Sequence, residues 1–204
     1  MIYGYNKANS HEKGEWEWHA QRNYSVKSRS CVFLSHKNED KPACHKIAKY
    51  LKKAGIDYYL DENDKDLQRA VSENNAYKIT ESIKKGIRNS THMLCVVSQK
   101  TKTSSWVPFE VGYGHAAIID KSMIEGERDK KIKLSILTLK DLSEEELPDF
   151  MKVGNIIRGI KGINKYISKI TNKSENELKN KGRIEVKMYS SLSHSLDNVL
   201  NWQK

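Results

Sequence analysis

The chain has 204 residues, of which 37% are hydrophobic and 30% charged, and its formal net charge at pH 7 is +10. This composition is typical of a soluble chain with one domain of ordinary size plus additional sequence. The first thirty residues are polar, and no apolar stretch approaches the roughly 20 residues needed to cross a bilayer. We therefore expect neither a secretory signal nor a membrane span.

Strand-like and helix-like segments alternate from Ser30 onward, which predicts a parallel sheet covered by helices on both faces. Short apolar segments predict five strands, at 31–35, 56–60, 92–98, 133–139 and 156–160. Apolar residues at helical spacing predict helices at 42–54, 79–87, 106–119 and 163–170. Residues 61–75 are rich in Asp, Asn and Glu and are predicted to form a long polar loop.

Residues 1–29 and 171–204 are predicted to be extensions of a domain that spans 30–170. The first extension carries more large rings than a solvated tail needs, so we expect them to pack against other residues: Tyr3, Tyr5, Trp16, Trp18 and Tyr24. In the second, the segment 184–189 is strand-like, and apolar residues follow on one side of a predicted helix: Leu192, Leu196, Val199 and Leu200. This helix needs an apolar surface to cover it, so we expect it to dock on the domain or on a partner chain.

The cysteines indicate neither a disulfide framework nor a metal site. Cys31 and Cys95 lie in apolar strand-like segments, where a free thiol behaves as a small hydrophobe. Cys44 and His45 are adjacent, so on a helix they diverge by about 100°, which is poor geometry for a nucleophile and its base. The histidines show no metal-ligand spacing with cysteine. We expect a reducing, cytoplasmic compartment and no bound metal.

The positive charge is spread along the chain and is not specific. A basic segment binds nucleic acid, an acidic partner or an anionic metabolite, and most often it is simply a solvated surface. No recognised nucleic-acid motif accompanies the charge, so we do not expect a nucleic acid as partner.

The predicted sheet places its ligand site between the ends of the first and third strands. In the common strand order 2-1-3-4-5 the winding direction reverses there, and open α/β sheets bind ligands at that point. The helix that follows the third strand begins at this crevice, and Trp106 and Glu110 lie four residues apart on one of its faces. A carboxylate and an indole therefore share one predicted site.

Two interpretations of this pair are open. A tryptophan at a helix start is usually a core residue, and a glutamate in the first turns usually complements the helix dipole. The functional interpretation rests on the apolar neighbours of Glu110, among which a carboxylate is costly without a task. Gly112 and Gly114 also lower helix propensity, as expected where another group approaches closely.

Several motifs together resemble a Toll/interleukin receptor (TIR) domain. They are VFLSH at 32–36, DEND at 61–64, IT..I..GI..S at 79–90, LCVVS at 94–98 and S-x-W-V-x-x-E at 104–110. Their order and spacing are similar to those of TIR domains and, more narrowly, to those of prokaryotic TIR proteins of antiviral defence. The resemblance covers residues 30–170, and the two extensions match nothing that we can name.

The resemblance implies a flavodoxin-like α/β fold with five parallel strands in the order 2-1-3-4-5. For the enzymatic branch of the family it implies cleavage of the nicotinamide–ribose bond of NAD, which yields nicotinamide and ADP-ribose or a cyclic ADP-ribose signal. NAD is then the substrate, and no cofactor is expected. The resemblance further implies homo-oligomers formed through TIR–TIR contacts and, where a signal is made, a separate effector protein that responds to it.

The resemblance also assigns roles to residues. Glu110 matches the catalytic glutamate, and Trp106 matches the aromatic residue that helps to form the nucleotide site. Further matches are substrate-binding positions in the loops after the first and second strands: Ser35, His36, Lys37, Asp61 and Asp64. For all of these except Ser35 a structural role is also open, with the two aspartates capping their own loop.

One carboxylate suffices for this chemistry. Ordinary glycosidases need a second carboxyl group, because the leaving oxygen must be protonated or water activated. Nicotinamide leaves from a pyridinium that is already cationic, so no acid is required. Glu110 then stabilises the oxocarbenium-like ribose by its charge and by hydrogen bonds to the ribose hydroxyls.

Two alternatives remain open from the sequence. A non-catalytic TIR signalling or scaffold module recruits partners through its loop and helix surfaces without cleaving NAD. A nucleoside deoxyribosyltransferase on the same fold also uses a pocket carboxylate, but it exchanges bases on deoxynucleosides and ignores NAD. Release of nicotinamide from NAD distinguishes the expected enzyme from both.

Overall fold

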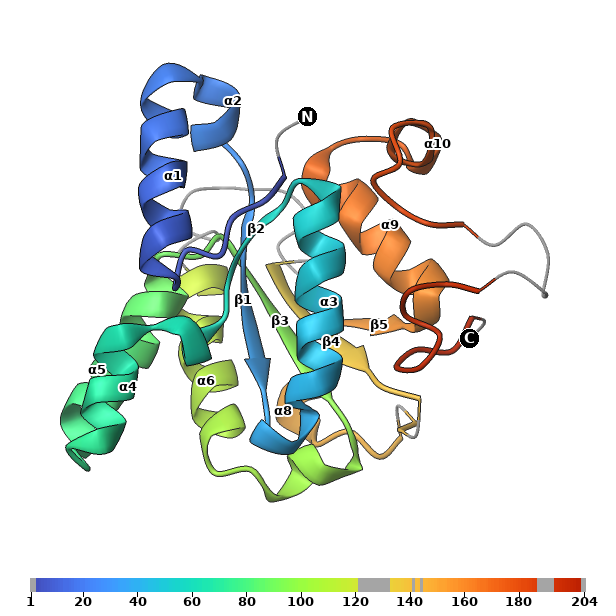
Figure 1. Ribbon diagram of the computed structural model, residues 1–204. Coiled ribbons are helices and arrows are strands. Elements are labelled where there is room, and N and C mark those ends of the chain that lie inside the picture. Colours follow the sequence, from blue (N-terminus) through green and yellow to red (C-terminus); the bar gives the residue numbers. More distant parts are fainter. Residues whose placement is uncertain (1–2, 121–132, 141, 144, 187–192, 203–204) are drawn as a thin grey trace.

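The computed structural model describes residues 3–120, 133–140, 142–143, 145–186 and 193–202 (Figure 1). Its centre is a five-stranded parallel sheet in the order β2-β1-β3-β4-β5. The strands are β1 (Cys31–His36), β2 (Asp57–Tyr59), β3 (His92–Val97), β4 (Leu134–Thr138) and β5 (Asn155–Arg158). The flavodoxin-like α/β fold and the strand order expected from the sequence are confirmed.

Helices cover both faces of the sheet (Figure 1). On one face α3 (Lys41–Ala54) and α9 (Gly159–Thr171) pack over β1, β3 and β4. On the other lie α5 (Ala76–Arg88), α6 (Trp106–Gly114), its π-helical continuation η4 (His115–Asp120), and α8 (Asp149–Lys152). Because both faces are covered, the central strands are apolar on both sides and buried along nearly their whole length.

The start and end of α3 follow from two residues. Pro42 lies in its first turn, where a missing N–H group leaves no hydrogen bond unmade. Gly55 ends the helix with φ of 84°, a left-handed conformation that favours glycine. These two residues mark the two ends of the helix that connects β1 to β2.

The segment 61–75, predicted as a polar loop, is instead largely helical. It forms the 3₁₀ turn η2 (Asp61–Asn63) and the helix α4 (Lys65–Ser72). The side chain of Asp64 caps α4 by accepting hydrogen bonds from two backbone N–H groups. Only Leu67 and Ala70 of α4 are buried, so the apolar pattern was too sparse to reveal the helix.

The N-terminal extension contains α1 (Ser10–Arg22) and α2 (Tyr24–Lys27), and residues 5–7 lie beside β2. The carbonyl of Tyr5 accepts a hydrogen bond from the N–H of Tyr58, and Asn6 forms a parallel bridge to Tyr58. These residues cover the outer edge of β2, which would otherwise be open to pairing with another chain.

The expectation that the N-terminal rings pack against other residues is confirmed for Tyr5, which is buried. Trp16 is half-buried, and the ammonium of Lys7 lies 3.9 Å from its ring centroid. Tyr3 and Trp18 are more than half exposed, but Arg183 lies near the Tyr3 ring, and Arg22 and His19 contact the Trp18 ring. The expectation is wrong for Tyr24, which is 81% exposed.

The C-terminal extension contains α10 (Glu175–Asn180), and residues 193–202 form turns in place of the predicted helix. Leu196 and Leu200 are nevertheless buried in the core cluster that α3 and α9 form. Backbone hydrogen bonds from Lys140 to the Val199 carbonyl and from Ile160 to the Asn201 carbonyl attach the turns to the domain. Local bonds within the turns, such as that from the Leu200 N–H to the Leu196 carbonyl, are kept beside these tertiary bonds.

Two parts of the C-terminal prediction lie outside the described residues, namely Leu192 and the end of the strand-like segment at 187–189. The first part of that segment, 184–186, is not a strand.

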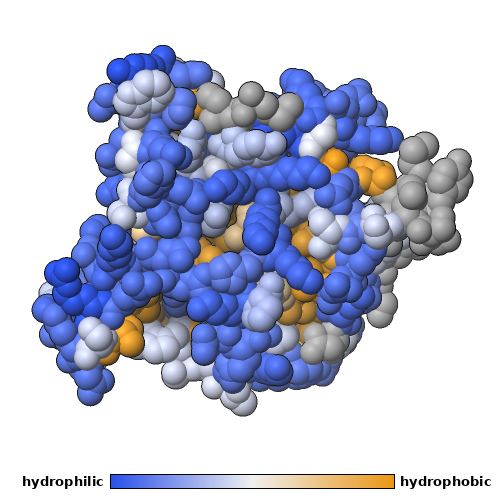
Figure 2. Space-filling model, in the orientation of Figure 1, coloured by the Kyte–Doolittle hydropathy of each residue, from blue (hydrophilic) through white to orange (hydrophobic). Residues whose placement is uncertain are grey.

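No helix in the described part of the chain has the length and apolar character needed to cross a bilayer. The face in Figure 2 is mainly hydrophilic, with small, separate hydrophobic patches.

Candidate functional site

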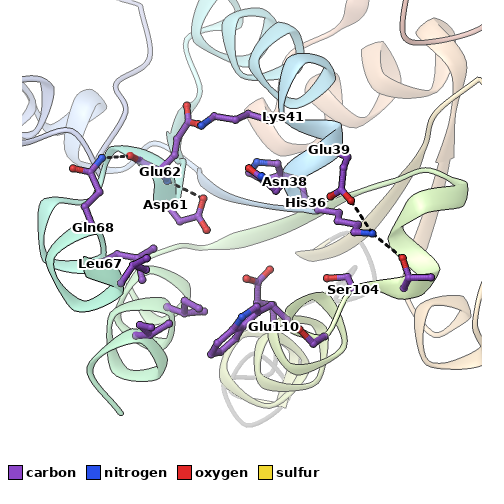
Figure 3. Close-up of a pocket in the computed structure, with 17 residues that line it drawn as sticks. His36, Asn38, Glu39, Lys41, Asp61, Glu62, Leu67, Gln68, Ser104 and Glu110 are labelled. Carbon is purple, nitrogen blue, oxygen red and sulfur yellow. Dashed lines mark hydrogen bonds and ion pairs between the residues drawn. The ribbon is translucent and has the colours of Figure 1, made fainter. Parts of the chain in front are cut away.

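A pocket of about 660 Å³ opens at the carboxyl ends of β1 and β3. The loop after β1, the η2–α4 segment, α5 and the start of α6 contribute its lining residues (Figure 3). This is the position at which an open α/β sheet with this strand order is expected to bind its ligand.

Glu110 reaches this pocket from the buried side of α6. Val107, Val111 and Gly114 share that side of the helix, at spacings of three, one and four residues from Glu110. A Cβ atom at Gly114 would collide with Met93 Sδ, so glycine is what allows α6 to approach β3 closely. Nothing lies near the equivalent position at Gly112, so the close approach expected from the sequence applies to Gly114 alone.

The Glu110 side chain points into the pocket, as Figure 3 shows, yet it is only 4% exposed. Ser35 at the end of β1 donates a hydrogen bond of 2.5 Å from Oγ to Glu110 Oε2. Burial raises the pKa of the Glu110 carboxyl to about 8; the Ser35 hydrogen bond opposes this shift, and the negative charge of Asp61 adds to it. Glu110 is thus protonated in a substantial fraction of molecules at neutral pH.

Trp106 begins α6 and lines the pocket one turn before Glu110. Its side chain is 40% exposed, and its ring contacts Phe109 edge to face with 6.0 Å between centroids. The interpretation of Trp106 as an ordinary core residue is therefore wrong, because a large part of the indole is available to a ligand.

The loops after β1 and β3 are tied together at the pocket rim. Lys37 Nζ donates to Thr103 Oγ1 at 2.7 Å and forms an ion pair with Glu39 at 3.0 Å (Figure 3). Beneath this contact the buried carboxylate of Asp40 accepts hydrogen bonds from the hydroxyls of Ser98 and Thr101. The rim is held in place by both sets of contacts before any ligand arrives.

The side of the pocket across from Glu110 carries further charged groups. His36 and Asp61 both line it; burial raises the pKa of Asp61, and the charge of His36 opposes that shift. The Glu62 carboxylate lies 2.5 Å from Lys41 Nζ and 2.5 Å from His45 Nε2, and these ion pairs join η2 to α3.

The structure brings six of the seven predicted site residues together at this end of the sheet: Ser35, His36, Lys37, Asp61, Trp106 and Glu110. It places Asp64 elsewhere. Asp64 caps α4 and accepts a hydrogen bond from the hydroxyl of Tyr59, so the structural role left open for it is the one observed.

Sequence reasoning missed the apolar wall of the pocket. This wall consists of residues from α4 and α5: Leu67, Val71, Ile79 and Ile83. Because α4 was predicted to be a loop, Leu67 and Val71 could not be assigned to the wall. Ile79 and Ile83 indicated only an amphipathic helix. Within the described residues, no group of three or more His, Cys, Asp or Glu side chains could hold a metal ion.

Comparison with known protein families matches residues 32–150 to the TIR domain, which is more than half of the chain. The match includes the segments that carry Ser35, Trp106 and Glu110, and the sheet continues beyond it through β5. A comparison with curated proteins finds no match. On the family match, together with the strand order of the sheet, the chain belongs to the TIR domain family.

Proposed function

We propose that this TIR domain is an NAD glycohydrolase in which Glu110 is the catalytic carboxylate. The supporting observation is that Glu110 is a buried acid without a cation. Among the described residues it forms no ion pair, and its hydrogen-bond partner is the neutral hydroxyl of Ser35. A carboxylate kept in this state weakens the fold, and such groups cluster at functional sites.

NAD supplies the cation that Glu110 lacks. Its nicotinamide is a pyridinium, and a positive charge close to Glu110 lowers the pKa of the carboxyl and favours the ionised form. When the bond between C1′ and the ring nitrogen breaks, both electrons leave with neutral nicotinamide and the positive charge passes to the ribose. Glu110 stabilises that oxocarbenium-like ribose, and its effect is strong because the site is shielded from water.

Two outcomes follow from the nucleophile that reaches C1′. Addition of water gives ADP-ribose and releases one proton. Attack by another atom of the same nucleotide gives a cyclic ADP-ribose: a ribose hydroxyl loses its proton as it bonds to C1′, whereas a ring nitrogen of the base, which carries no proton, becomes cationic. The pocket volume of about 660 Å³ lies within the roughly 300–1,000 Å³ of small-molecule sites.

The pocket lining also suits a dinucleotide. The exposed part of Trp106 and the apolar wall offer surfaces on which a base or nicotinamide ring stacks. Lys37 and Lys41 stand at the rim, where a pyrophosphate could replace their present carboxylate partners Glu39 and Glu62.

The proposed setting is bacterial anti-phage immunity in the cytoplasm, and the resemblance to prokaryotic antiviral TIR proteins is what supports it. The enzyme would either deplete NAD or make a nucleotide signal that a separate effector protein detects. TIR domains commonly self-associate, so activity should be measured at high protein concentration.

Chromatography of NAD incubated with the protein tests the proposal. Wild type should release nicotinamide, and Glu110→Gln, which keeps the shape of the side chain, should lower the rate by about 100-fold or more. Glu175→Gln is the matched control, because Glu175 is an exposed residue of α10 and should leave the rate unchanged. Absence of nicotinamide release by folded wild type at every concentration would identify a non-catalytic module, and base exchange on deoxynucleosides would identify a deoxyribosyltransferase.

A further inference from the structure

A second cavity, of about 380 Å³, lies at the amino ends of β1 and β2, the end of the sheet opposite Glu110. The segment before β1, the end of α3, the end of α9 and Arg183 form its walls, at the top of Figure 1. Its cationic residues come from the two extensions, outside the matched residues 32–150.

The charge of this cavity is unbalanced. Arg29, Lys173 and Arg183 line it, and none of the described residues in its lining carries a carboxylate. Arg29 and Lys173 form no ion pair with any residue in the described ranges. The two guanidinium groups also lie close enough for the charge of Arg29, added to burial, to lower the pKa of Arg183. Like charges are brought together here, and no described residue of the wall supplies an anion.

The two arginines are held in place by the same residue, Tyr3. Arg29 Nη1 donates to the Tyr3 carbonyl at 2.9 Å, and the Arg183 guanidinium lies 5.7 Å from the centroid of the Tyr3 ring. Arg183 Nη1 also donates to the carbonyl of Lys53 at 2.9 Å. Because these contacts already orient both side chains, the guanidinium N–H donors are preorganised for a ligand.

Helix dipoles do not account for all of this charge. The carboxyl ends of α3 and α9 face the cavity, and each is equivalent to about half a negative charge. Together they offset about one positive charge, which is less than the two charges of Arg29 and Lys173, the lining cations that form no ion pair among the described residues. Hydroxyl-bearing residues complete the lining: Ser25, Ser28, Ser30 and Thr171.

We propose that this cavity binds the phosphate group of a small metabolite, with Arg29, Lys173 and Arg183 as its ligands. Guanidinium groups present paired N–H donors that match two phosphate oxygens, and hydroxyl groups add single hydrogen bonds. A binding site of this volume holds a phosphate or diphosphate with part of the group that carries it. The site does not depend on the proposed NAD chemistry.

Calorimetric titration with pyrophosphate and with adenosine monophosphate tests this site, at an ionic strength held constant with sodium chloride. Both titrations use the Glu110→Gln protein and further variants made in it, so that no turnover occurs. Removing one cation, in Lys173→Gln or Arg29→Gln, should weaken phosphate binding about tenfold or more. Lys165→Gln is the matched control, because this exposed lysine of α9 is not in the cavity lining and should bind as before.

Three results would overturn the proposal. Equal affinity in Lys173→Gln and Lys165→Gln would place the anion elsewhere, and binding no tighter than that of chloride would remove the site. If an oligonucleotide bound more tightly than pyrophosphate or adenosine monophosphate, and with strong salt dependence, the cationic residues of the cavity would be part of a nucleic-acid binding surface. Because Arg183 also binds the end of α3, Arg183→Gln is scored only after its melting temperature without ligand matches that of the control.

Discussion

Glu110 and Asp57 are both buried carboxylates of this domain, but they have opposite surroundings. Asp57, at the start of β2, is fully buried, accepts a hydrogen bond of 3.1 Å from the Tyr5 N–H, and pairs with Lys7 at 3.6 Å. Glu110, on α6, has the hydroxyl of Ser35 and the negative charge of Asp61 close by. Burial raises both pKa values, and a cation opposes the shift only at Asp57.

This difference separates a structural acid from a candidate catalytic one. The partners of Asp57 come from the N-terminal extension, so its charge attaches that extension to the edge of the sheet. The charge of Glu110 attaches nothing, and its ionisation opposes folding until a cation enters the pocket. Substitutions at Glu110 and at Asp57 therefore test the two roles separately.

The largest expected effect is on how stability depends on pH. Glu110 has a folded-state pKa of about 8, above the ordinary 4.5, so the folded protein holds this proton more tightly than the unfolded chain does. The stability that the protonated form contributes is complete below about pH 4.5 and is lost as the pH rises through 8. Glu110→Gln should therefore be more stable than wild type at pH 9 and unfold at a higher denaturant concentration. The expected gain in the free energy of unfolding is a few kcal/mol, since each pKa unit corresponds to about 1.4 kcal/mol.

At pH 5 the same two proteins should differ little, because wild-type Glu110 is then protonated and resembles glutamine. Urea unfolding at both pH values, with Glu175→Gln as control, measures this difference. A Gln variant that is less stable than wild type at pH 9 would show that Glu110 has a stabilising partner and would remove the contrast with Asp57.

A smaller effect is expected from Asp57→Ala. The Tyr5 N–H loses its acceptor and Lys7 loses its ion-pair partner, so the variant should lose about 1–3 kcal/mol of stability. Amide hydrogen exchange should speed up in residues 4–7, which lie along β2. The control Asp66→Ala removes an exposed ion pair with Lys85 and should change stability by less than about 0.5 kcal/mol.

The folded Asp57→Ala protein should still release nicotinamide at the wild-type rate, because Asp57 does not line the pocket. A loss of turnover comparable to that in Glu110→Gln, in protein shown to be folded, would mean that the two carboxylates do not have separate roles.

The surroundings of Glu110 could be predicted from the sequence, because they depend on residues near it in the local pattern. Apolar neighbours around Glu110 indicated that its side chain is buried. The end of the first predicted strand indicated that Ser35 lies at the crevice. The pairing of Asp57 with Lys7 joins residues far apart in the chain, and nothing in the spacing of either one reports it. The contacts of Asp40 with Ser98 and Thr101 escaped prediction for the same reason.

Helix α4 escaped prediction for a different reason. Its burial is limited to Leu67 and Ala70, and its first turn is held by the cap at Asp64, so its polar composition resembled a loop. The helix supplies part of the apolar wall of the pocket, and that wall could not be assembled without it. Periodicity therefore located Glu110, the candidate catalytic residue, but not the apolar surface across the pocket from it.

The smallest expected effect tests the hydrogen bond that Ser35 donates to Glu110. Ser35→Ala removes the contact that opposes the raised pKa, so the carboxyl should ionise at still higher pH. A hydrogen bond to a charged group contributes about 1.5 kcal/mol, which corresponds to a shift on the order of one pKa unit. In free wild-type enzyme kcat/KM for NAD should rise with pH toward a midpoint near 8, and in Ser35→Ala that midpoint should move upward. Ser35→Thr keeps the hydroxyl and should restore the wild-type midpoint; if both variants lower kcat/KM equally at every pH, Ser35 serves only to pack the end of β1.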